Sequence, residues 1–136
     1  MYMLDTNILI YCMRHPESGC ASTVSEHLGN DLCISVITYA ELEYGIENSS
    51  RPLQNREAVN KILAGIRILD FDMDAALHFG RVLAELKKKG LYSGHRDRDK
   101  MIAAHARSLG YTLVTDNVKD FADIDRLSLD NWLRDE

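Results

Sequence analysis

Long hydrophobic runs are missing from this sequence of 136 residues. No apolar stretch approaches the roughly 20 residues that a membrane-spanning helix needs, so the sequence argues against an integral membrane protein. The N-terminus also lacks the basic segment and long apolar stretch of a secretory signal, and we expect a cytoplasmic protein. With only 2 prolines and 8 glycines, no internal repeat and no linker, residues 1–136 are predicted to form one domain.

Cysteine is scarce as well. The three cysteines, Cys12, Cys20 and Cys33, form no pair separated by two residues and have no histidine at a matching spacing. This pattern excludes the common zinc motifs and fits a reducing compartment. We expect the three side chains to be small buried hydrophobic groups.

An excess of positive charge is also absent. The formal net charge is −5 and the pI is near 5.5, which argues against nucleic-acid binding through a broad basic surface. Basic residues nonetheless gather along one segment, at Lys87, Lys88, Lys89, Arg96, Arg98, Lys100 and Arg107. Two interpretations stay open: a local nucleic-acid contact, or a solvated helix end where lysines favour the helix dipole.

The sequence does contain a regular alternation of short apolar runs and amphipathic segments. The apolar runs predict strands at residues 1–4, 32–35, 66–69, 111–114 and 126–129. Between them, apolar residues recur every three or four positions, as in helices. Because strands that alternate with helices favour a parallel sheet, we predict a single-domain α/β/α sandwich. Its central sheet is mostly parallel, with four to five short strands.

Four acidic residues stand where apolar runs give way to loops or helix starts: Asp5, Glu41, Asp99 and Asp116. All four can face the rim beyond the carboxyl ends of the strands, where open α/β sheets bind ligands. Carboxylates gathered there need a cation, and oxygen ligands suit Mg²⁺ or Mn²⁺, ions that carry phosphoryl chemistry. A second interpretation of Glu41 stays open, because it follows Thr38 by three residues and fits a helix capping box.

Four segments taken in order resemble the PIN-domain family: MLDTNILI, SVITYAELEYG, DKMIAAHARSLGYTLVTDNVKDF and LDNW. Within that family they are most similar to the toxin ribonucleases of VapBC toxin–antitoxin modules, over essentially the whole chain. The resemblance implies a PIN-like fold and a Mg²⁺- or Mn²⁺-dependent endoribonuclease that cleaves tRNA or another structured RNA. It also implies a homodimer and a VapB-like antitoxin that blocks the acidic site and contacts residues 48–52 and the first two helices.

Carried onto this sequence, the resemblance makes Asp5, Glu41 and Asp99 metal-binding catalytic acids. Family members often carry Thr, any residue and then Asp or Asn, a pattern that selects Asn117 for the fourth position. Asp116 is the adjacent carboxylate, and both residues stay open. Two hydroxyl side chains would orient the carboxylates without binding the metal; these are Thr6 and Thr115.

The loop before the last long helix departs from the family pattern. Glycine, two residues and then the acid would select Asp97 after Gly94, whereas counting back from the segment IAAHA selects Asp99. We favour Asp99 because a fixed helix places a carboxylate better than a variable loop does. Asp97 remains the alternative acid.

RNA requires positive charge beside the metal to hold its backbone. Arg96, Arg98 and Lys100 flank Asp99 and are predicted to bind RNA. Attack by a metal-activated water would leave a 5′-phosphate and a 3′-hydroxyl and would need no catalytic histidine. His105, on the apolar helix, is predicted to be packed and hydrogen-bonded.

Two other functional classes compete with a nuclease. A non-catalytic dimeric interaction protein, whose acids are helix caps and surface charge, would bind no metal. A phosphatase of the haloacid dehalogenase type would need two aspartates separated by one residue after the first strand. The sequence has Asp5, Thr6 and Asn7 there, so residue type excludes that phosphatase.

Overall fold

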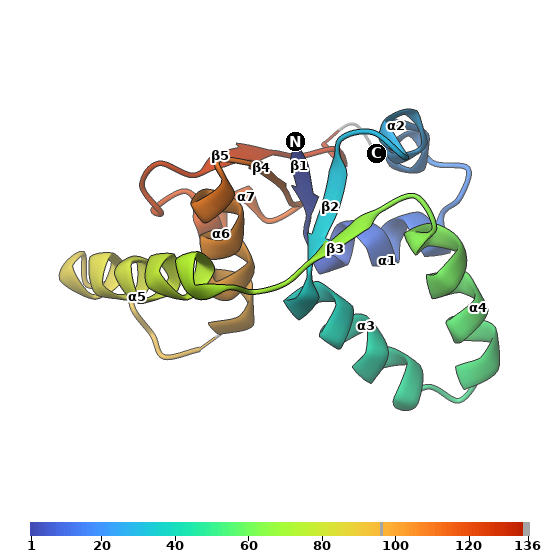
Figure 1. Cartoon of the computed structure of the whole chain (residues 1–136), viewed down its shortest axis with the longest axis horizontal. Helices are drawn as coiled ribbons and strands as arrows, with labels where there is room; N and C mark the ends of the chain where they lie inside the picture. Colours follow the sequence, from blue (N-terminus) through green and yellow to red (C-terminus); the bar gives the residue numbers. More distant parts are fainter. Residues whose placement is uncertain (96, 135–136) are drawn as a thin grey trace.

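The computed structural model describes residues 1–95 and 97–134. At its centre lies a five-stranded sheet with the order β3-β2-β1-β4-β5, in which every neighbouring pair of strands is parallel (Figure 1). The predicted α/β architecture is therefore confirmed. The strands are short, and each lies close to its predicted place: β1 (Tyr2–Leu4), β2 (Leu32–Ser35), β3 (Arg67–Leu69), β4 (Thr112–Val114) and β5 (Ser128–Asp130).

Helices cover both faces of the sheet (Figure 1). One group packs on one face: α1 (Thr6–Arg14), α2 (Gly19–His27), α3 (Val36–Glu47) and α4 (Pro52–Leu63). The other group packs on the opposite face: α5 (Met73–Lys88), α6 (Asp97–Leu109) and α7 (Val118–Phe121). Successive strand side chains point to opposite faces, so Leu4 and Val114 enter the first core while Met3 and Leu113 enter the second.

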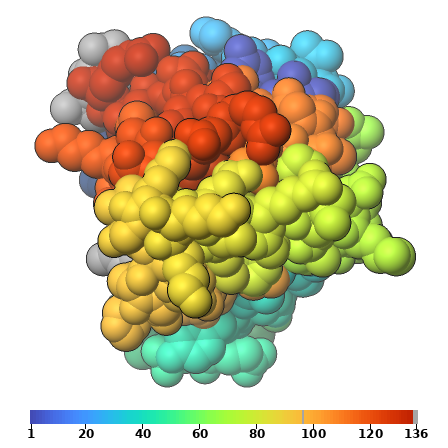
Figure 2. Space-filling model, turned by 90° about the vertical axis from the view of Figure 1, so that its left-hand side faces the viewer, coloured from blue at the N-terminus to red at the C-terminus, as the bar shows by residue number. Residues whose placement is uncertain are grey.

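The second face is the one that Figure 2 presents. There α5, in yellow-green, crosses the front of the molecule, and the chain beyond β4, in orange and red, lies above it. Beneath α5 lies α6, whose residues 102–107 are buried. The N-terminal end of α6, which carries two aspartates in its first turn, is thereby fixed against the body of the protein.

Capping residues set the ends of the helices. Asp5 and Asp72 cap α1 and α5, since a carboxylate oxygen of each accepts a hydrogen bond from a backbone N–H of the first turn. Gly90 and Gly110 follow α5 and α6 with φ angles of 75° and 68°. Glycine takes this left-handed conformation without the steric cost of a Cβ atom, so both helices stop there.

Two predicted helix starts are wrong. Ser35, at the end of β2, caps α3 through its hydroxyl oxygen, and Thr38 is buried within the first turn. The capping box of Thr38 and Glu41 therefore does not form. The second correction concerns the loop expected around Asp97: α6 begins at Asp97, so Asp97 and Asp99 both stand in the first turn of the helix and not only Asp99. Acidic side chains in a first turn favour the helix dipole, and two of them extend this helix toward the loop.

The structure bears on two expectations from the sequence, one about membrane-spanning helices and one about the cysteines. The described part of the chain has no helix long and apolar enough to cross a membrane. Cys12, Cys20 and Cys33 are buried, and none of them takes part in a disulfide. The prediction that the cysteines serve as small buried hydrophobic groups is confirmed.

Candidate metal centre

Asp5 lies where β1 ends and α1 begins, and only 5% of its surface is exposed. Its Oδ1 accepts the backbone N–H of Thr6 at 2.8 Å, and its Oδ2 accepts the hydroxyl of Thr115 at 3.0 Å. The pKa of Asp5 is raised to about 6: burial is the main cause, the charges of Asp99 and Glu41 add to it, and the two hydrogen bonds act in the opposite direction. Three carboxylates from distant parts of the sequence thus act on one another.

Glu41 reaches this position from the second turn of α3. The Thr6 hydroxyl donates to its Oε1 at 2.8 Å, and the hydroxyl oxygens of Thr6 and Thr38 lie 3.2 Å apart. Thr6 therefore contacts two of the predicted acids, Asp5 with its backbone N–H and Glu41 with its hydroxyl. A threonine beside the strand end holds the two carboxylates in a fixed relation.

The two aspartates at the start of α6 have different surroundings. The charge of Asp99 contributes to the raised pKa of Asp5, whereas Asp97 is not among the groups that shift it. Asp97 is the first residue of the helix, and its Oδ1 is buried with no hydrogen-bond partner in the described part of the chain. Of the two aspartates, Asp99 is therefore the one whose charge acts on the carboxylate of Asp5.

Asp116 and Asn117 are the two candidates for the fourth position of the site, and their surroundings differ. Asp116 is exposed, and its charge is not among those that shift the pKa of Asp5. Asn117 is half-buried, and its backbone N–H donates to Thr115 Oγ1 at 3.1 Å. Because Thr115 in turn donates to Asp5, Asn117 joins the hydrogen-bond chain of the acidic group while Asp116 faces solvent.

The donor set of this site consists of carboxylate and hydroxyl oxygens, the ligands that hard divalent cations prefer. Within residues 1–95 and 97–134, however, no three acidic, histidine or cysteine side chains lie close enough together to hold a metal ion. Like charges repel one another, and Glu41 is held by Thr6. The residues therefore fit a divalent cation by chemistry and location, but their carboxylates would have to draw together around it.

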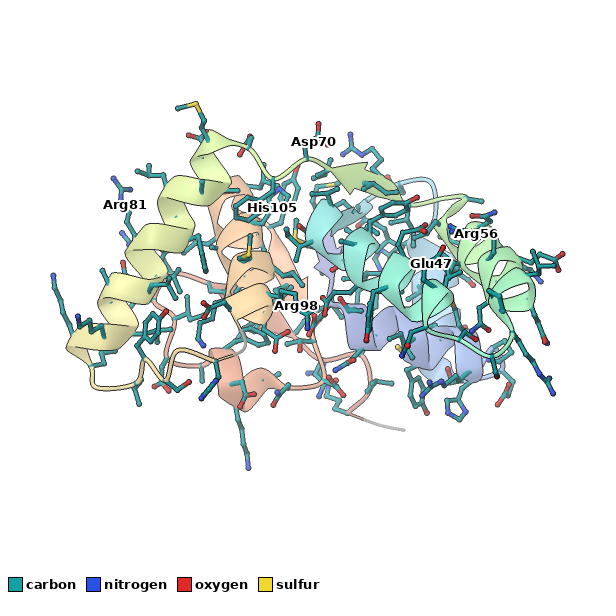
Figure 3. The ribbon with its side chains drawn as sticks, turned by 90° about the horizontal axis from the view of Figure 1, so that it is seen from below. Glu47, Arg56, Asp70, Arg81, Arg98 and His105 are labelled. Carbon is teal, nitrogen blue, oxygen red and sulfur yellow. The ribbon has the colours of Figure 1, made fainter. Side chains whose placement is uncertain are left out.

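Two of the predicted RNA-binding residues, Arg98 and Lys100, lie in the first turn of α6. Arg96 is outside the described residues, and Arg98 is exposed. In Figure 3, seen from the side of the strands' carboxyl ends, Arg98 lies between the ribbons of α6 and α3. Lys100 Nζ donates to the His95 carbonyl and lies 5.8 Å from the centre of the Tyr92 ring. Two cations thus border the side on which Asp99 lies.

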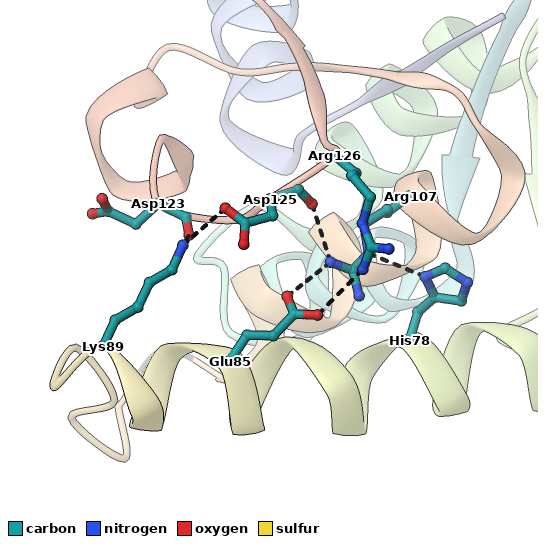
Figure 4. Close-up of polar contacts among 7 residues, drawn as sticks. All are labelled: His78, Glu85, Lys89, Arg107, Asp123, Asp125 and Arg126. Carbon is teal, nitrogen blue, oxygen red and sulfur yellow. Dashed lines mark hydrogen bonds and ion pairs between the residues drawn. The ribbon is translucent and has the colours of Figure 1, made fainter.

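Arg107 does not belong to this basic surface, because its side chain is only 3% exposed. It donates to Glu85 Oε2 at 3.0 Å, to the carbonyl of Asp125 at 3.1 Å and to His78 Nδ1 at 3.1 Å (Figure 4). Burial and the charge of Arg107 lower the pKa of His78. Arg126 also forms an ion pair with Glu85. Arg107 and Arg126 together therefore hold the chain before β5 against α5.

His105 is packed and hydrogen-bonded, as predicted. Its Nδ1 lies 2.8 Å from Ser35 Oγ, its ring meets Phe71 edge-on, and it is 2% exposed. Figure 3 shows it on α6 toward Asp70, away from Arg98. Burial lowers the pKa of His105, which leaves the ring neutral and structural.

Sequence reasoning missed a pocket beside Asp99. This pocket, which we term the α6–α7 pocket, has a volume of about 340 Å³. Its wall comes from α5, α6, α7 and the loops beside them: Leu86, Leu91, Ser93, His95, Asp99, Lys100, Lys119, Asp120, Phe121 and Asp123. No motif marks these residues, since only the tertiary fold brings α7 against the loop before α6.

Comparisons with known proteins place the chain in a family. The family model for the PIN domain matches residues 2–127. Ribonuclease VapC2 of Haemophilus influenzae is 41% identical over 97% of this chain and 98% of its own length. The tRNA(fMet)-specific endonuclease VapC of Shigella flexneri is 37% identical, covering 96% of this chain and 97% of its own length.

Solved structures are similar over the same extent. A DNA-bound VapBC2 complex from Rickettsia felis contains a chain with a TM-score of 0.88 and 35% identity, covering 96% of this chain and 98% of that one. A DNA-bound VapBC complex from Salmonella typhimurium gives a TM-score of 0.88 and 36% identity, covering 96% and 97%. The family model, the relatives and the similar solved structures together show that this chain belongs to the PIN-domain family, within its VapC ribonucleases.

Proposed function

We propose that this chain, acting as one domain over residues 1–136, is a Mg²⁺- or Mn²⁺-dependent endoribonuclease and the toxin of a toxin–antitoxin pair. The observation that carries the proposal is the carboxylate of Asp5, whose pKa is raised mainly by burial and in addition by the charges of two acids, Asp99 and Glu41. Carboxylates of like charge that lie close together in a buried place lower the stability of the folded protein, and a bound dication offsets that cost.

Asp5, Glu41 and Asp99 are the proposed ligands, with Asp116 or Asn117 completing the set and Asp97 as the alternative acid. A bound dication lowers the pKa of a water and neutralises charge on the scissile phosphate. Thr6 and Thr115 keep the carboxylates oriented by donating to them. In-line attack by water leaves a 5′-phosphate and a 3′-hydroxyl.

The proposed substrate is a structured RNA, and initiator tRNA is the first to test. Two relatives, from Shigella flexneri and Salmonella typhimurium, are named tRNA(fMet)-specific endonucleases. Arg98 and Lys100 stand beside Asp99 and can hold the phosphate backbone. Arg96 is proposed for the same role on sequence grounds.

The proposed partner is a small VapB-like antitoxin, since the similar solved structures include VapBC complexes. A groove of about 370 Å³ between α1, α3 and α4 is lined by Glu41 together with apolar residues such as Ile10, Leu42 and Val59. A peptide placed there would end beside the acidic group and block it.

We also propose a homodimer. Three apolar side chains at the β3 edge and the start of α5 are exposed, at 40% for Ile68, 89% for Met73 and 51% for Leu77. Apolar side chains gathered on one side are typical of an interface. Light scattering of the purified protein would measure the mass, and a monomer at all concentrations would contradict this part of the proposal.

A cleavage assay tests the activity. Purified protein is incubated with initiator tRNA and with total RNA, in EDTA, Mg²⁺ or Mn²⁺, and the RNA ends are mapped. We expect metal-dependent cuts with 5′-phosphate ends, which Asp5→Asn, Glu41→Gln and Asp99→Asn reduce by roughly 100-fold or more, on the scale of removing an essential catalytic group.

Matched controls lie at exposed acids of α2 and α4, Glu26→Gln and Glu57→Gln, which should cleave like the wild type. If the wild type cleaves no RNA under any metal condition, the nuclease proposal fails and the non-catalytic interaction protein remains. If Asp97→Asn abolishes cleavage and Asp99→Asn does not, the assignment of the third ligand is reversed.

A further inference from the structure

We propose that the α6–α7 pocket binds a single nucleotide of the RNA, next to the bond that is cut, and thereby selects the cleavage site. This inference rests on the proposed ribonuclease function and adds a substrate subsite to it. The pocket shares one wall with the acidic group, because Asp99 lines it.

The shape and lining of the pocket suit one unstacked nucleotide. Its volume of about 340 Å³ lies at the small end of the roughly 300–1,000 Å³ of ligand pockets in proteins. Leu91, 47% exposed, provides apolar surface at the pocket, and the buried side chains of Leu86 and Phe121 form the wall behind it. An apolar wall accepts the face of a base, which loses its stacking partners when it leaves an RNA strand.

A chain of hydrogen bonds joins the pocket to Asp5. Thr115 donates to Asp5 Oδ2 and accepts from the backbone N–H of Asn117. The side-chain amide of Asn117 donates in turn to Asp120 Oδ2, and Asp120 lines the pocket. A nucleotide in the pocket would therefore contact Asp99 directly and be linked to Asp5 through Asp120, Asn117 and Thr115.

The pocket is lined by basic side chains, which suit the phosphate of a nucleotide, and by acidic side chains, which suit the donor groups of its base. Lys100 and Lys119 offer ammonium groups to a phosphate, and Lys100 is anchored by the His95 carbonyl. Asp120 and Asp123 offer carboxylate oxygens, which accept hydrogen bonds from amino and imino groups of a base. Guanine presents two adjacent donors to a carboxylate and uracil only one, so the pocket should prefer guanine.

Binding can be tested without cleavage. The protein is labelled with ¹³C in its leucine methyl groups, kept in EDTA, and titrated separately with GMP, AMP, CMP and UMP. We expect the methyl signals of Leu86 and Leu91 to shift, with GMP binding roughly three- to tenfold tighter than UMP, the worth of one further hydrogen bond.

Leu91→Trp, which fills the pocket from an exposed position, should abolish the shift of Leu86. Leu109→Trp is the matched control, since Leu109 is also partly exposed but lies at the other end of α6. If no leucine near the pocket shifts at saturating GMP, or if Leu91→Trp leaves the shift unchanged, the pocket is not a nucleotide site.

A second experiment separates this inference from the proposed function. A pool of RNA with random sequence is digested and the cut sites are sequenced for the wild type, Leu91→Trp and Leu109→Trp. We expect the wild type and the control to share a preference for one base beside the cut, which Leu91→Trp loses while still cleaving. Equal preferences in all three proteins would overturn the pocket and leave the nuclease intact. A wild type that cuts nothing would overturn the nuclease, while the titration still reports on the pocket.

Discussion

Asp5 illustrates how one residue can serve folding and function in opposite ways. As the cap of α1 it satisfies a backbone N–H, which stabilises the helix. As a buried carboxylate beside Asp99 and Glu41 it is costly, and its pKa rises to about 6 for that reason. Asparagine would keep the cap and remove the charge, so this substitution separates the two roles.

Asp5→Asn should stabilise the metal-free protein in a pH-dependent way. Between the ordinary pKa of 3.8 and the folded value of about 6, the folded chain keeps a proton that the unfolded chain has lost. The free energy of unfolding of the wild type therefore falls as pH rises through this range. The advantage of Asp5→Asn should grow from about zero at pH 4 to at most about 3 kcal/mol above pH 6.

Urea denaturation in EDTA at several pH values measures this advantage. Asp74→Asn serves as the control, because Asp74 is exposed in the first turn of α5. An advantage of Asp5→Asn that stays constant from pH 4 to pH 7 would show that the Asp5 carboxylate is not electrostatically strained.

At the scale of the elements, α6 does most to shape the candidate site. Its first turn carries Asp97 and Asp99, while its middle residues are buried against the sheet and α5. Near its end, Arg107 ties α6 to Glu85 of α5 and to the carbonyl of Asp125. The position of Asp99 thus depends on contacts made along the whole helix.

Arg107→Met should destabilise the protein by about 3 kcal/mol, because it leaves Glu85 without its buried partner. Arg126→Met is a matched control: it removes the other ion pair of Glu85, but Arg126 is 72% exposed, and the change should stay within about 0.5 kcal/mol. Urea unfolding at pH 7 compares the two. Equal effects would show that burial of Arg107 adds nothing to the strength of this contact.

At the scale of the whole molecule, the candidate site draws on both helical layers. Asp5 and Glu41 lie at the start of α1 and on α3, in the first layer, whereas Asp99 lies in the first turn of α6, in the second. A dication bound there would connect the two layers across the edge of the sheet. Binding would then stabilise the folded chain as a whole, because the unfolded chain has no such site.

Thermal denaturation should detect this coupling. At a Mn²⁺ concentration of about 100 times Kd, the wild type should gain about 2.7 kcal/mol and melt at a higher temperature. EDTA should reverse the gain, and Asp5→Asn and Asp99→Asn should lose most of it. If both variants are stabilised as much as the wild type, Mn²⁺ binds elsewhere on the protein.

Much of the fold was predictable from the sequence because the information is local. Short apolar runs mark the strands, and glycines with positive φ mark the ends of α5 and α6. The predicted start of a helix was wrong where two nearby residues could both serve as its N-cap. Ser35 and Thr38 both suit a cap, and the backbone at the end of β2 selects Ser35.

The sequence by itself determined the parallel α/β architecture, since short apolar runs that alternate with amphipathic helical segments favour a parallel sheet. It also predicted strands that end directly before Asp5 and before Thr115 and Asp116. Only the tertiary structure decided that Glu41 pairs with Thr6, that Arg107 is buried and that a pocket opens beside Asp99. These features depend on side chains far apart in the sequence whose distances are set by packing, and packing leaves no periodic signal along the chain.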